Sequence, residues 1–349
     1  MLEQEYIQEL ASYGFDPHGR KDTAKIPPNE LREVIEHDII ESALRDGASF
    51  STAIGIAKSF SNGIGSAALD ATKQMLHNLA LRKENAVETQ GGSLKKPVYV
   101  GEYPCIGINA RVKRYASGYV VFIHRELMTA LHQAAKIYSW SWSFSDVDEI
   151  GIRVSEPAWH PDDTLLALAH LAGEVIQRNA TCTPRFRVPG GKRFWVYAST
   201  LEAAELFVVA HEYAHILNAD FADDESPIAW IENAADSLAW SLVFAGIDRS
   251  GNTVGERDEA KARIAGILLL FGLRRLVQQV REQIFTTKPD QSVPELERIE
   301  KFRMFLERHA DPELMEHFES CFNWWSFATD LILEKCNWSE ANPVPSYPV

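Results

Sequence analysis

The sequence predicts an α+β protein that is mostly helical and contains a small sheet. Apolar residues recur at helical spacing over most of its 349 residues. Short runs rich in Val, Ile and Tyr, which are typical of strands, gather between residues 98 and 124. Hydrophobic residues make up 46% of the chain and charged residues 24%, proportions that exclude a disordered or fibrous protein.

The acidic balance of the chain limits its partners. Its 35 Lys and Arg against 49 Asp and Glu give a formal net charge of −14, which excludes nucleic acid and anionic membrane surfaces as partners. Four widely spaced cysteines without a C-x-x-C pair favour a reducing compartment. The best apolar run, residues 264–273, is far shorter than the roughly 20 residues of a membrane span. Because the acidic N-terminus also lacks a signal-peptide pattern, we expect a cytoplasmic protein.

Residues 1–92 are predicted to form a helical region of unassigned role. Asn29 can cap a helix that Gly47 ends, and a second helix is predicted over 66–81. The charged run 82–97 contains two consecutive glycines and is the best candidate for a linker.

Strands are predicted after this linker. The runs 98–112 and 119–124 are separated by a Ser-Gly turn, and aromatic residues alternate with serines over 138–144. A helix is predicted over 162–175, and 193–197 is a further strand candidate after a Pro-Gly-Gly turn.

From Ser199 onward the chain is predicted to be almost entirely helical. Ser199 and Glu202 fit the spacing of a capping box, which would start the first of these helices. Residues 93–341 are therefore expected to form the functional domain, and the proline-containing residues 342–349 a flexible tail.

Chemistry is concentrated at residues 211–215, which are His-Glu-Tyr-Ala-His. On a helix, His211 and His215 lie on one face and can bind a single zinc ion. Glu212 is adjacent to this face and is placed to act as a general base on a water molecule. The preceding residues are apolar almost all round, so the helix is buried, and burial of these polar groups is costly without a ligand.

A third ligand is predicted seventeen residues after His215, at Glu232. It lies on a second helix, for which Ser226 is the candidate cap, with Asp236 one turn later on the same face. Two histidines and a glutamate leave one position for water, as in catalytic zinc sites, and Asp236 would accept the second ring N–H of a ligating histidine. The alternative third ligands are three acidic loop residues: Asp223, Asp224 and Glu225.

At these residues the chain resembles the gluzincin metallopeptidases, and in particular the compact intracellular minigluzincins of bacteria and mobile elements. The resemblance assigns His211, His215 and Glu232 to one zinc ion per chain, Glu212 to the catalytic base and Asp236 to the support of a ligand. It covers residues from about 193 to 246 and implies a small sheet packed on the two helices of the site. The metzincin pattern is excluded because Phe221 stands where its third histidine would be.

The resemblance implies a zinc-dependent endopeptidase that hydrolyses a specific intracellular protein or peptide and binds it as an added strand, for which 193–197 is the candidate edge. The residue that would stabilise the oxyanion is open: His309, His317 and Arg298 are candidates, each expected at the surface. The alternative function is a non-catalytic, zinc-stabilised regulatory or partner-binding protein. The sequence predicts neither the cleavage specificity nor the oligomeric state.

Overall fold

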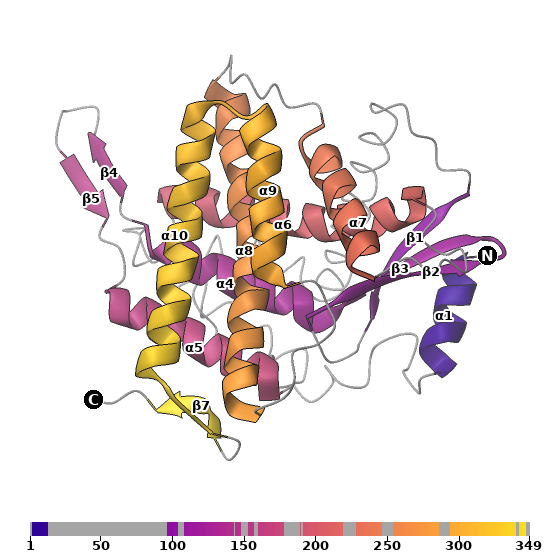
Figure 1. The fold of residues 1–349 in the computed structure, drawn as a ribbon, viewed down its shortest axis with the longest axis horizontal. Coiled ribbons are helices and arrows are strands. Elements are labelled where there is room, and N and C mark those ends of the chain that lie inside the picture. Colours follow the sequence, from indigo (N-terminus) through magenta and orange to yellow (C-terminus); the bar gives the residue numbers. More distant parts are fainter. Residues whose placement is uncertain are drawn as a thin grey trace, which may run out of the picture.

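The computed structural model describes residues 2–12, 96–103, 108–142, 144–147, 153–156, 160–177, 189, 191–218, 228–245, 254–285, 294–339 and 342–346. These residues confirm the α+β class, with eight helices and a small mixed sheet (Figure 1). The helices predicted over 29–47 and 66–81 and the linker at 82–97 lie mostly or wholly outside the described residues.

The main sheet has three strands in the order β1-β3-β2. Strand β1 (Val98–Tyr103) pairs in parallel with β3 (Gly118–His124), and β2 (Ala110–Tyr115) pairs antiparallel with β3. The central strand β3 is apolar and almost fully buried because both faces of the sheet are covered.

Helix α1 (Leu2–Ser12) covers one face of this sheet. Its Leu10 packs with Val120 and Phe122 of β3, and the Glu9 carboxylate pairs with the Lys113 ammonium at 2.7 Å. The first residues of the predicted N-terminal region therefore lie against the sheet that follows the predicted linker.

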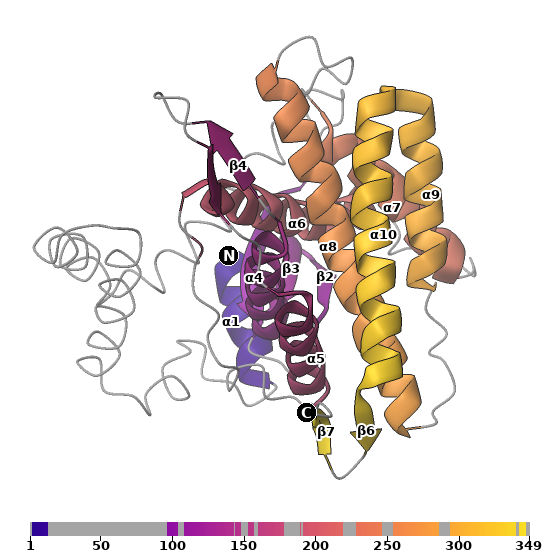
Figure 2. The same ribbon diagram turned by 90° about the vertical axis from the view of Figure 1, so that its left-hand side faces the viewer.

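Helices cover the other face, where Val121 and Ile123 of β3 join the main core. Helix α4 (Arg125–Trp140) follows β3 directly, and α6 (Gly191–Asn218) crosses the middle of the molecule. Four more helices complete this part of the fold (Figure 2): α8 (Val254–Phe285) packs on α6, α5 (Pro161–Gln177) packs on α4 and α8, and both α9 (Glu295–His309) and α10 (Pro312–Lys335) pack on α8. Helix α7 (Ile228–Val243) packs on α6 and α9.

Helices α6 and α8 approach each other closely at Gly266. A Cβ atom on this glycine would lie 2.5 Å from the Cβ of Ala203 and 2.6 Å from the backbone nitrogen of Ala204. The absence of a side chain at 266 therefore sets the distance between these two helices.

Two strand predictions are wrong. Residues 193–197 belong to α6, where Arg193 and Tyr197 are buried while Trp195 is 72% exposed, which is helical spacing. The Arg193 guanidinium donates to the backbone oxygen of Trp142 at 3.0 Å, and the Tyr197 hydroxyl lies 2.8 Å from His132 Nδ1. These tertiary contacts outweigh the strand propensity of the aromatic residues.

The alternating segment 138–144 is also mainly helical. Tyr138 and Ser139 are consecutive and both fully buried, which a half-buried strand does not allow. Only Phe144 begins a strand, β4 (Phe144–Val147), which pairs with β5 (Arg153–Glu156).

The predictions of a helix cap at Ser199 and of a flexible tail from residue 342 are also wrong. Because α6 begins at Gly191, Ser199 lies inside it and donates to the Trp195 backbone oxygen at 2.6 Å, so it caps nothing. Residues 342–346, expected in a flexible tail, form β7 (Asn342–Ser346), which pairs with β6 (Asn337–Ser339). Among the helices that the structure describes, none combines the length and the apolar character that a membrane span requires.

Candidate metal centre

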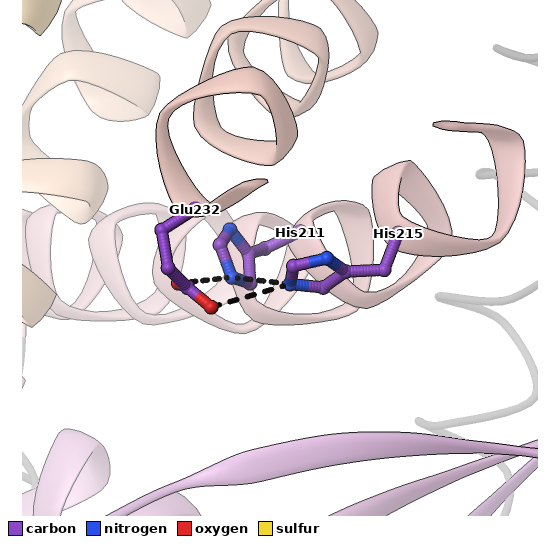
Figure 3. Close-up of side chains that lie close together, drawn as sticks. All are labelled: His211, His215 and Glu232. Carbon is purple, nitrogen blue, oxygen red and sulfur yellow. Dashed lines mark hydrogen bonds and ion pairs between the residues drawn. The ribbon is translucent and has the colours of Figure 1, made fainter. Parts of the chain in front are cut away.

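Helix α6 positions the two histidines of the motif. From Ala203 to Ala210 its residues are buried on every side, which holds the helix rigidly against the core. His211 and His215 are one turn apart, and their Nε2 atoms converge to 3.1 Å (Figure 3). Their rings are nearly perpendicular, and the Nε2 atoms are the ones that converge.

Helix α7 brings Glu232 to these nitrogens. Its Oε2 lies 3.3 Å from His211 Nε2, and its Oε1 lies 3.7 Å from His215 Nε2. Tetrahedral zinc with ligands at 2.0–2.1 Å separates ligand atoms by about 3.3–3.4 Å, and the three observed separations lie around this value. His211, His215 and Glu232 therefore form a group that could hold a metal ion.

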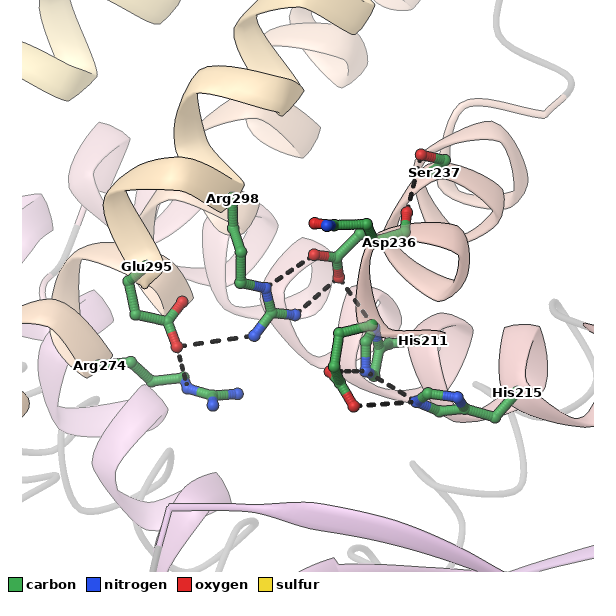
Figure 4. A network of polar contacts seen from close by, with 9 residues as sticks. His211, His215, Asp236, Ser237, Arg274, Glu295 and Arg298 are labelled. Carbon is green, nitrogen blue, oxygen red and sulfur yellow. Dashed lines mark hydrogen bonds and ion pairs between the residues drawn. The ribbon is translucent and has the colours of Figure 1, made fainter. Parts of the chain in front are cut away.

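Asp236 supports this group from one turn further along α7. Its Oδ1 lies 2.9 Å from His211 Nδ1, so the carboxylate is placed to orient the ring with Nε2 toward Glu232. Asp236 is fully buried and is itself held by Arg298 of α9, whose Nη2 and Nε donate to its two oxygens at 2.6 and 2.7 Å (Figure 4). This bidentate pair connects α9 to the site, in addition to α6 and α7.

The expectation that Arg298 lies at the surface is wrong. The residue is 3% exposed, and its guanidinium also lies 4.8 Å from the centre of the Phe271 ring. His317 Nε2 lies 3.2 Å from the backbone oxygen of Lys261, and His309 packs on Phe305. Neither histidine lines the cavity of the site.

Charges around His211 control its ionisation. Burial lowers the pKa of this imidazole, but the Asp236 and Glu232 carboxylates outweigh burial and raise it to about 9. Burial also opposes ionisation of Glu232, but contact with His211 and the charge of Arg298 bring the pKa of Glu232 down to about 2. A metal ion must therefore displace a proton from His211, which makes its affinity fall with falling pH.

Glu212 faces the cavity beside these residues and is 5% exposed. Burial raises the pKa of its carboxyl, although the neighbouring histidines partly oppose this. A buried carboxyl with a raised pKa is more basic than one in water, which suits an acceptor of protons near neutral pH.

The cavity measures about 470 Å³, a size typical of ligand sites, and α6, α7, β2, α8 and α9 all contribute to its wall. Strand β2 lies at one edge of the three-stranded sheet. The backbone oxygen of Asn109 accepts from the nitrogen of His124 at 3.1 Å, so the alternation of an antiparallel pair directs the backbone N–H and C=O of Ala110 and Val112 away from β3. Both residues line the cavity.

Arg274 is a charged residue of the cavity to which the sequence assigns no role. Arg274 of α8 lines the cavity, and Glu295 of α9 accepts its Nε at 2.8 Å. In the sequence, Arg274 only ends an apolar run, so nothing in the local pattern predicts its place beside the histidines. The alternative ligands Asp223, Asp224 and Glu225 lie outside the described residues.

Comparison with known protein families, with curated proteins and with solved structures finds no match for this chain. The candidate metal centre therefore stands on its geometry and on the chemistry of its residues.

Proposed function

We propose that this chain is a zinc-dependent endopeptidase of the gluzincin type that acts on a protein or peptide. The observation that carries the proposal is the convergence of His211, His215 and Glu232 at ligand distances, with the Glu212 carboxyl in the same cavity. A purely structural metal site has no use for Glu212, whose burial as a charged group is unfavourable.

The donor set fits one zinc ion per chain. Two imidazole nitrogens and one carboxylate oxygen are ligands that zinc prefers, and three protein ligands leave a fourth position for water, as in catalytic sites. Bound there, zinc would act as a Lewis acid and lower the pKa of water to about 7. Asp236 would keep His211 in the tautomer that presents Nε2 as a ligand.

Glu212 performs the proton transfers in this proposal. It accepts a proton from the water molecule whose oxygen attacks the carbonyl carbon of the scissile peptide bond. As the C–N bond breaks, the same carboxyl delivers that proton to the leaving nitrogen. The buried carboxyl suits both steps because its raised pKa favours the protonated form between them.

The substrate binds in an extended conformation along β2. This strand takes the role predicted from the sequence for 193–197, because those residues are helical whereas β2 is an edge strand on the cavity. The outward N–H and C=O groups of Ala110 and Val112 would pair with the peptide backbone. Such backbone pairing fixes the position of a peptide on the strand and does not depend on the identity of its side chains.

The cellular setting is part of the same proposal. Cys321 and Cys336 are buried, free thiols, which suits the reducing cytoplasm. The net charge of −14 favours a protein or peptide partner over nucleic acid or an anionic membrane surface.

Glu212→Gln tests the proposed chemistry. The variant removes the proton acceptor and keeps the shape of the side chain, so it should retain zinc and lose activity by a factor of about 10² to 10⁴ or more. Zinc-loaded wild type and variant are incubated with a peptide library derived from a whole proteome, and newly formed N-termini are counted by mass spectrometry. New termini with the wild type alone would support the proposal. Equal numbers with both proteins would refute the role of Glu212, and none with a zinc-loaded wild type would favour a non-catalytic zinc protein.

A further inference from the structure

We propose that Arg274 binds a carboxylate of the substrate beside the metal centre. The inference rests on the proposed function and extends it to the chemistry of the substrate: a peptide with an acidic side chain or a C-terminal carboxylate close to the bond that is cleaved. It is carried by the place of Arg274 in the cavity and by the contacts that hold its guanidinium.

Arg274 lies on α8 and lines the same cavity as His211 and Glu212. Its side chain is 28% exposed, and its Nε pairs with Glu295 Oε1 at 2.8 Å. Within the described part of the chain, its two Nη atoms make no hydrogen bond or ion pair, although the charge of Arg274 acts on the nearby Glu212 carboxyl, and Figure 4 shows this end of the side chain directed toward the histidines. One N–H from each of the two NH₂ groups at this end forms the planar fork that matches the two oxygens of a carboxylate.

A series of contacts between groups of alternating charge holds Arg274 in place. His211 contacts Asp236, Asp236 binds Arg298, and Arg298 Nη1 lies 3.6 Å from the Glu295 oxygen that pairs with Arg274. The residues at the two ends of this series, His211 and Arg274, both line the cavity. The guanidinium is therefore oriented before a ligand arrives, which reduces the entropy lost on binding.

Arg298 cannot take this role although it also lines the cavity. Both oxygens of Asp236 are bound by its guanidinium, and its side chain is 4% exposed. Arg298 acts as a positioning residue, whereas Arg274 supplies hydrogen-bond donors to the cavity. A carboxylate is the partner that satisfies both the charge and the geometry of these donors.

The test uses peptide hydroxamates, which bind zinc in a cleavage site, on the full-length zinc-loaded protein. The compounds of the first series have an amidated C-terminus and carry one aspartate or glutamate, which is moved through each position in turn. Each is compared with the compound that has asparagine or glutamine at the same position. A second series is neutral in its side chains and ends in a free carboxylate. Dissociation constants are measured by isothermal titration calorimetry for the wild type, Arg274→Gln and Arg275→Gln. Arg275 is the matched control because its guanidinium binds the Ser326 hydroxyl at 3.2 Å and does not line the cavity.

We expect at least one carboxylate series to bind wild type about 10- to 100-fold more tightly than its neutral counterpart. Arg274→Gln should lose this preference and keep its affinity for the neutral compounds, and Arg275→Gln should keep both. A preference in the first series alone assigns the site to an acidic side chain, and a preference in the second alone assigns it to a C-terminus. Equal binding of charged and neutral compounds by wild type, or a preference that survives in Arg274→Gln, would overturn the inference alone. Failure of every hydroxamate to bind zinc-loaded wild type would overturn the proposed function, and this inference with it.

Discussion

Replacement of Arg298 by methionine removes the positive charge that neutralises Asp236. Both side chains are almost inaccessible to water, and their two hydrogen bonds are 2.6 and 2.7 Å long. Methionine keeps an apolar side chain against Phe271, so the main loss is the charge and its hydrogen bonds. Asp236 is left as a buried carboxylate with the contact to His211 Nδ1 as its remaining polar support.

The expected loss of stability follows from this environment. Removal of one partner of a buried ion pair costs about 3–5 kcal/mol. We expect about 3 kcal/mol here, because the contact with His211 supports the remaining Asp236 charge. An unfolding entropy of about 2.1 cal/mol/K per residue gives about 0.7 kcal/mol/K for the 349 residues, so the melting temperature should fall by roughly 4 °C.

Thermal unfolding in a metal chelator measures this loss without a contribution from bound metal. Arg303→Met is the matched control: Arg303 lies on the same helix, but its side chain is 41% exposed and pairs with Glu319 at the surface. The control should change stability by less than about 1 kcal/mol. If Arg298→Met destabilises the protein no more than Arg303→Met, the buried pair does not hold α7 against α9 as argued.

Two further variants test the packing of α6, the helix that carries His211 and His215. Burial raises the pKa of Glu205 to about 8, against an ordinary value of 4.5, so between these pH values the folded protein keeps a proton that the unfolded chain releases. Stability of the wild type should therefore fall from pH 6 to pH 8 by on the order of 2 kcal/mol more than that of Glu205→Gln, as measured by urea unfolding; parallel pH profiles would contradict this. Gly266→Ala should force α8 away from α6, since the new Cβ would lie 2.5 Å from that of Ala203, and should cost about 1–3 kcal/mol in the same assay. An unchanged urea midpoint would contradict this, because it would show that the two helices can separate without a loss of stability.

Local periodicity predicted much of the fold. The apolar helical spacing at 162–175 corresponds to α5, and the Val- and Ile-rich run 119–124 corresponds to β3. The same reasoning failed at 193–197 because Arg193 and Tyr197 find their partners on α4 and in the residues just after it. Strand propensity is a weak preference that such long-range contacts override.

For the candidate metal centre, the sequence predicted what lies within one turn of a helix. The spacing of four residues put His211 beside His215 and Glu232 beside Asp236, and the structure brings these two pairs together. Arg298 follows Asp236 by 62 residues, and its pairing depends on how α9 packs on α7. A contact between residues so far apart in the sequence cannot be predicted from a local pattern, and the sequence therefore wrongly places Arg298 at the surface.

Elemental analysis of protein purified without added metal shows whether His211, His215 and Glu232 hold one metal ion. Wild type and Glu232→Ala are compared with Glu300→Ala, which removes an exposed glutamate of α9. We expect about one zinc per chain in wild type and in Glu300→Ala, and little or none in Glu232→Ala. Absence of zinc from wild type, or a zinc content unaffected by Glu232→Ala, would contradict it.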